Sequence, residues 1–202
     1  MFRSLDDNRL RRVLVAGVGS SHGDDRLGWD AVQCLQRALH RSARHGVAGE
    51  VIVEQLPAPA ELLDALERHG PLRRVIVCDA IGPGAVGGER GTGPWIGRWR
   101  WPAVPVERTR SASTHGIGLV DTLRTAEVLG RLPAEVVIVG MEGRRFGQLG
   151  ELSPECRSRM PTLVQVLLEE CRLVTVSPHE AADGGRSAEN PNGRRTCTKP
   201  PW

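Results

Sequence analysis

The sequence predicts an α/β fold: a three-layer sandwich, with a mostly parallel sheet, helices on both faces and one antiparallel edge strand. Two observations predict it. Short apolar runs closed by glycine or a polar residue alternate with longer segments whose apolar residues recur every three or four positions. Such βα units cross over right-handedly and place helices on both faces of parallel strands. One later segment instead alternates tryptophan with arginine, which is typical of an exposed antiparallel edge strand.

The first half of the chain has the order βαβα. Val13 to Ala16 is an apolar run that predicts a strand buried on both faces. After a glycine-rich turn, a helix is expected from Leu27, because apolar residues recur there at helical spacing and charged residues occupy the other side. Residues 50–55 predict a second strand, and Leu62 to Leu66 a short helix after two prolines.

The second half begins with a strand over residues 74–78 that ends at Asp79. A glycine-rich loop follows, and then Trp95 to Val104, the predicted edge strand, whose tryptophans should pack on a helix. Residues 116–129 show helical spacing, with Ser113 or Thr114 placed to cap the helix.

The last two predicted elements are a buried strand and a long helix. Residues 136–140 form the apolar strand pattern. Ser153-Pro154-Glu155 supplies a cap, a proline at the first helical position and an early acid, so a helix should begin there and bury a stripe that ends at Cys171.

Length and composition indicate one domain with a tail. The chain has 202 residues, so residues 1–174 are expected to form a single α/β domain, and the Pro-, Gly- and Arg-rich residues 175–202 a disordered tail. The net charge is +3 with scattered arginines, so no nucleic-acid partner is expected. No apolar run could span a membrane, and five unpatterned cysteines suit a reducing compartment. We therefore expect a cytoplasmic monomer.

Three polar sites follow apolar runs and should meet at one edge of the sheet. Asp24 and Asp25 lie in the turn before the first helix, Asp79 ends the third strand, and His115 precedes a later helix. Ligands bind at the carboxyl ends of parallel strands. Each residue alone has an ordinary structural explanation, but two carboxylates and an imidazole together suit a divalent metal ion. Cys78 should point to the opposite face and take no part.

The sequence fits a dinucleotide-binding site, a serine nucleophile or a histidine ligand from the glycine loop less well. Gly17-Val18-Gly19 suggests a dinucleotide fingerprint, but the next glycine is Gly23 and two aspartates stand where the diphosphate would lie. The serines of the glycine loop and Ser113 lack the arrangement that activates a nucleophile. His22 could reach a metal ion from the same loop, but a solvated histidine is the favoured interpretation.

The chain resembles the [NiFe]-hydrogenase maturation endopeptidases over about residues 12–173. The motifs that carry the resemblance are Val-Leu-Val-Ala-Gly-Val-Gly-Ser with Gly-Asp-Asp-Arg-Leu-Gly (13–28), Val-Ile-Val-Cys-Asp-Ala-Ile (75–81), Ser-Thr-His-Gly-Ile-Gly-Leu (113–119), Val-Val-Ile-Val-Gly-Met-Glu (136–142) and Leu-Ser-Pro-Glu (152–155). They occur in the family's order. Ser20 stands where the family usually carries Asn, and Asp25 where Glu is also common.

This resemblance implies a function and a set of site residues. The family removes a C-terminal extension from the hydrogenase large-subunit precursor after nickel insertion. Its nickel-sensing positions match Asp25, Asp79 and His115 here, and Asp25 and Asp79 are also the candidate catalytic carboxylates. Nickel would be borne by the substrate or bound transiently, as a checkpoint before an irreversible cut. Whether the metal or a carboxylate activates water stays open.

Two other classes of function remain as alternatives. A metallochaperone or assembly factor would use the same three residues to bind nickel or the large subunit without cutting it. A doubly wound nucleotide-binding protein is the third hypothesis, and thermal-shift measurements with dinucleotides would test it.

Overall fold

The computed structural model describes residues 12–42, 50–82, 94–103, 118–147 and 149–172. In these residues the strands form a sheet of order β2-β1-β3-β5-β4, in which all neighbours are parallel except the antiparallel pair β4 and β5. The predicted α/β class and the antiparallel edge strand are therefore confirmed.

The element bounds follow the predicted order. The strands are β1 (Val13–Val18), β2 (Val51–Leu56), β3 (Arg74–Ile81), β4 (Ile96–Arg100) and β5 (Glu135–Glu142). The helices are α2 (Leu27–Ser42), α3 (Leu62–His69), α4 (Leu119–Val128) and α5 (Pro154–Arg172), with short 3-10 helices η1 (Gly23–Arg26) and η3 (Pro59–Glu61).

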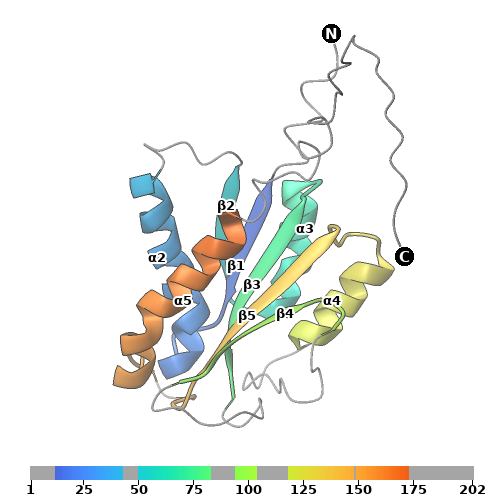
Figure 1. Ribbon diagram of the computed structural model, residues 1–202. Coiled ribbons are helices and arrows are strands. Elements are labelled where there is room, and N and C mark those ends of the chain that lie inside the picture. The colour runs from blue at the N-terminus through green and yellow to red at the C-terminus, as the bar shows by residue number, and fades with distance from the viewer. Residues whose placement is uncertain (1–11, 43–49, 83–93, 104–117, 148, 173–202) are drawn as a thin grey trace, which may run out of the picture.

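The sheet separates two hydrophobic cores. Helices α2 and α5 cover one face, and α3 and α4 cover the other (Figure 1). Because side chains alternate along a strand, Ile76 and Cys78 of β3 pack with α2 and α5, whereas Val75 and Val77 pack on the opposite side. This alternation also decides which face each polar residue near the end of β3 can reach.

Several boundaries differ from the sequence-based ones. Strand β3 continues through Asp79 to Ile81, because Asp79 and Ala80 still pair with β5. Helix α4 begins at Leu119 with Gly118 at its N-cap position, later than predicted. The expected caps, Ser113 and Thr114, lie outside the described residues. The expected tail and the end of the proposed domain, residues 173–202, lie outside them as well.

Two other expectations are met at the edge strand and at the last helix. Trp99 and Trp101 pack against the core beneath α3 and α4. The hydroxyl of Ser153 accepts a hydrogen bond of 3.3 Å from the Cys156 backbone N–H, so Ser153 caps α5.

A buried ion-pair network lies at the amino-terminal ends of β3 and β5. Arg74, which is 3% exposed, donates from Nε to Glu135 at 2.7 Å and pairs with Glu170 at 3.3 Å. Glu170 of α5 is fully buried and also pairs with Arg98 of β4 at 2.8 Å. The network therefore joins the central strands, the edge strand and the last helix.

Among the described helices, none is both long and apolar enough to cross a membrane.

Candidate active site

The candidate site is built at the point where β1 passes into the glycine loop. Close backbone approach explains the glycines: a Cβ on Gly19 would lie 2.1 Å from the carbonyl oxygen of Asp25, and one on Gly28 would lie 2.1 Å from that of Val18. A side chain at either position would clash with backbone. The loop can therefore fold back, and the start of α2 can lie directly against the sheet.

Asp24 points into the protein and holds separate segments together. Its carboxylate accepts hydrogen bonds from the backbone N–H groups of Arg144 (2.8 Å), Arg145 (2.9 Å) and Ser153 (2.7 Å). Burial acts to raise the pKa of Asp24, but these hydrogen bonds and one from the Ser153 side chain outweigh it, so the pKa lies below its ordinary value. Asp24 is fully buried, and its role is structural.

Asp25 has different surroundings and stays partly exposed. The hydroxyl of Ser20 donates a hydrogen bond to Asp25 Oδ2, and the same oxygen of Ser20 lies 3.0 Å from Nδ1 of His22. The backbone N–H of Asp25 also donates to the carbonyl of His22 at 3.0 Å. The histidine for which a solvated side chain was favoured is therefore part of the hydrogen-bond system around Asp25.

Asp79 reaches the same region from β3. The register pairs Gly17 of β1 with Cys78, which places Asp79 beside the end of β1. Burial, and next the negative charge of Asp25, raise the pKa of Asp79 to about 8, although a hydrogen bond from the Ala80 N–H opposes the rise. Asp25 and Asp79 are therefore close enough for the charge of one to shift the pKa of the other.

The third predicted residue, His115, lies outside the described residues, four positions before α4 begins. Within the described part of the chain, no group of three or more His, Cys, Asp or Glu side chains could hold a metal ion. Cys78 faces the core under α2 and α5, and burial raises the pKa of its thiol, so it is an unsuitable ligand, as expected.

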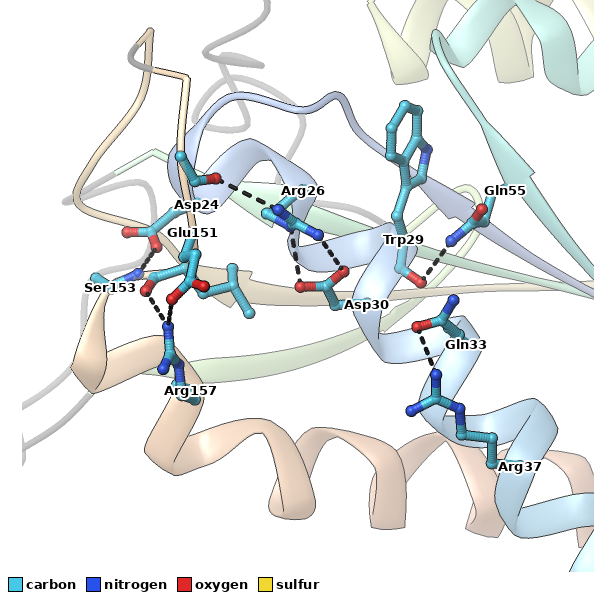
Figure 2. A network of polar contacts seen from close by, with 12 residues as sticks. Asp24, Arg26, Trp29, Asp30, Gln33, Arg37, Gln55, Glu151, Ser153 and Arg157 are labelled. Carbon is cyan, nitrogen blue, oxygen red and sulfur yellow. Dashed lines mark hydrogen bonds and ion pairs between the residues drawn. The ribbon is translucent and has the colours of Figure 1, made fainter.

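A pocket of about 360 Å³ lies on the flank of this region, between α2 and the start of α5. Figure 2 shows two ion pairs there, Arg26 with Asp30 on α2 and Arg157 with Glu151 at the start of α5. Neither Asp25 nor Asp79 lines the pocket. It is therefore separate from the carboxylate pair.

Comparison with known families supplies an independent assignment. A sequence model of the HycI hydrogenase maturation protease family matches residues 57–170, more than half of the chain. The chain belongs to this family. Its members are peptidases, so the protein is a hydrolase of the hydrogenase maturation type. No curated protein sequence matches the chain significantly.

Solved structures show the same fold. The hydrogenase maturating endopeptidase HybD from E. coli is 23% identical with a TM-score of 0.61, and the match covers 80% of this chain and 93% of that one. A second endopeptidase structure from Escherichia coli has a TM-score of 0.63 at 23% identity, covering 82% and 94%. For HycI from Thermococcus kodakarensis the TM-score is 0.54 at 20% identity, covering 79% and 91%.

The sequence patterns missed the different roles of the neighbouring acids and the hydrogen bonds of His22. Asp24 binds N–H groups about 120 residues away in the chain, which no local pattern reveals. For His22 a signal was present, because Ser20, His22 and Asp25 lie within six residues of one tight loop.

Proposed function

We propose that the protein is an endopeptidase that removes the C-terminal extension from the nickel-loaded large-subunit precursor of a [NiFe] hydrogenase. It would act as a cytoplasmic monomer. The observation that carries the proposal is the approach of Asp25 and Asp79 at the edge of the sheet, in a chain of the hydrogenase maturation protease family. Nickel is part of the substrate in this proposal, and Asp25, Asp79 and His115 read its presence.

The carboxylate pair fits such a role on chemical grounds. Two carboxylates that approach each other disfavour their joint ionisation, and a divalent cation removes that cost. Carboxylate oxygens with an imidazole nitrogen are suitable ligands for nickel. Asp79 lies on the same side of β3 as Val75 and Val77, the side that α4 covers. His115, which precedes α4 in the sequence, is the third residue of the proposed site.

The reaction needs a water molecule to attack one peptide bond. Nickel at the site would supply Lewis-acid stabilisation of the developing charge. Without the metal, the raised pKa of about 8 means that Asp79 holds a proton at neutral pH. Asp79 must release that proton to become a metal ligand. A carboxylate that is not engaged by the metal could accept a proton from the water, and Asp25 and Asp79 are the candidates.

The direct test is the intact mass of the precursor. Nickel-loaded and nickel-free large-subunit precursors are incubated with and without the protein. We expect loss of a C-terminal peptide only from the nickel-loaded sample. Asp79→Ala and His115→Ala should abolish processing, whereas the control Asp121→Ala, an exposed acid on α4, should retain it. An unchanged mass in every sample would support the non-cleaving assembly factor instead, and near-normal processing by both site variants would refute the site assignment.

A further inference from the structure

Ser20 lies between His22 and Asp25 and can connect them. Its hydroxyl donates to Asp25 Oδ2, and its oxygen is 3.0 Å from His22 Nδ1. All three side chains are partly buried and belong to the loop that joins β1 to α2. We call these three residues the Ser20 clamp.

The hydrogen-bonding capacities of the groups determine the direction of the chain. The Ser20 hydroxyl carries a single proton and donates it to Asp25 Oδ2. The Ser20 oxygen then offers only lone pairs to His22. Nδ1 of His22 must therefore carry a proton, and the order of donation is His22 to Ser20 to Asp25.

The backbone keeps the three residues in place. The Ser20 N–H donates to the Asp25 carbonyl at 3.3 Å, and the Asp25 N–H donates to the His22 carbonyl at 3.0 Å. His22 also forms a β-bridge with Leu149 from the loop after β5. Backbone hydrogen bonds within the loop and the bridge to Leu149 therefore both hold the clamp in place.

We propose that Ser20 and His22 are positioning residues for Asp25. They hold Oδ2 and leave Oδ1 to the metal ion, so Asp25 would be a ligand through one oxygen. This inference rests on the proposed function, in which that metal is the precursor's nickel. A carboxylate that ligates through one oxygen and is already oriented suits a metal that must be recognised and then released with the product.

The first test reads the histidine tautomer and needs no substrate. Imidazole nitrogen NMR of the full-length protein is recorded at about pH 8, above the ordinary histidine range, and the His22 signals are assigned by their loss in His22→Asn. We expect the Nδ1–H tautomer in the wild type and a shift toward Nε2–H in Ser20→Ala. An Nε2–H tautomer in the wild type, or identical signals in the two proteins, would overturn the proposal.

The second test is the rate of precursor processing. Ser20→Ala should lower kcat/KM about tenfold, as expected when an outer partner of a ligand is lost. Ser20→Thr and Ser20→Asn, which keep a donor, should recover most of the rate, and His22→Asn should be faster than His22→Ala. The matched control is Ser21→Ala, because Ser21 is the exposed neighbour of Ser20.

Coupling distinguishes positioning from an independent role. If His22 acts through Ser20, the double variant Ser20→Ala/His22→Ala should be no slower than Ser20→Ala alone. Additive losses would overturn the clamp. A wild-type protein that shows the expected tautomers but cleaves no nickel-loaded precursor would refute the proposed function and still support the clamp.

Discussion

Two neighbouring aspartates show how surroundings decide the role of a residue. Asp24 is fully buried and accepts three backbone hydrogen bonds, so it is stable as a carboxylate. Asp25 is partly exposed, and its charge helps to raise the pKa of Asp79. The first residue stabilises the loop, and the second belongs to the candidate site.

The raised pKa of Asp79 predicts a pH-dependent stability. Between about pH 4 and the folded-state pKa of about 8, the folded protein holds a proton on Asp79 that the unfolded chain has released. Stability must therefore fall as the pH rises through this window. Asp79→Asn removes the titration and should stabilise the protein by up to about 5 kcal/mol at about pH 8.5, with little gain near pH 4. Urea unfolding of both proteins at the two pH values measures this difference.

The same variant separates stability from function. Asp79→Asn should fail to process the precursor although it is the more stable protein, as expected for a residue placed for function at a cost in stability. A constant difference in the free energy of unfolding at the two pH values would show that Asp79 has an ordinary pKa.

At the scale of elements, Asp24 connects η1 to the loop after β5 and to the start of α5. Asp24→Ala would leave three backbone N–H groups without their acceptor, and we expect a loss of about 3 kcal/mol in the free energy of unfolding. Chemical denaturation measures it. Asp30→Ala, which breaks the partly exposed pair between Arg26 of η1 and Asp30 of α2, is the control and should cost less than about 1 kcal/mol.

Acid should reduce the contribution of Asp24. Its folded-state pKa is lowered, so the stabilisation is present above the unfolded pKa near 3.8 and is lost as the pH falls through the folded-state value. The difference between wild type and Asp24→Ala should therefore shrink in acid. A difference that is independent of pH would contradict the assigned hydrogen bonds.

The strands and helices show which structural features can be predicted from a sequence pattern. The runs in β1, β3 and β5 were predictable because both of their faces are buried and apolar residues are therefore continuous. The extension of β3 beyond Asp79 was not predictable, because this polar residue interrupts the apolar run although the pairing with β5 continues. The late start of α4 at Leu119 depends likewise on more than local spacing.

The candidate site was predictable in part for the same reason. Parallel topology brings strand ends together, so the alternation of strands and helices predicts that Asp25 and Asp79 lie at the same edge of the sheet, and the charge of Asp25 does affect the pKa of Asp79. The different surroundings of Asp24 and Asp25 could not be predicted in this way. They depend on backbone N–H groups of Arg144, Arg145 and Ser153, which lie far along the chain.

On the scale of the whole molecule, the two ends of the sheet carry different charged groups. The carboxyl-terminal end of β3 carries Asp79, and the amino-terminal end carries Arg74 with the buried network around Glu170. Burying a charge is costly unless its partner is present. The network is therefore expected to contribute to the stability of the fold and to have no part in the chemistry at the other end.

Glu170→Ala tests this division. It leaves the buried Arg74 without one of its two acidic partners, so the free energy of unfolding should fall by about 3 kcal/mol, and Tm by roughly 6–12 °C for a chain of this size. Processing per folded molecule should stay within about twofold of wild type, because distant sites act independently. Arg98→Ala removes the exposed partner of Glu170 and should cost less. Calorimetry and the precursor mass assay measure the two quantities.

Asp79→Asn and Glu170→Ala should have opposite effects on stability and on processing. Asp79→Asn should raise stability at alkaline pH and abolish processing, whereas Glu170→Ala should lower stability and retain processing. A Glu170→Ala protein that is folded but inactive would show that the two ends of the sheet are coupled.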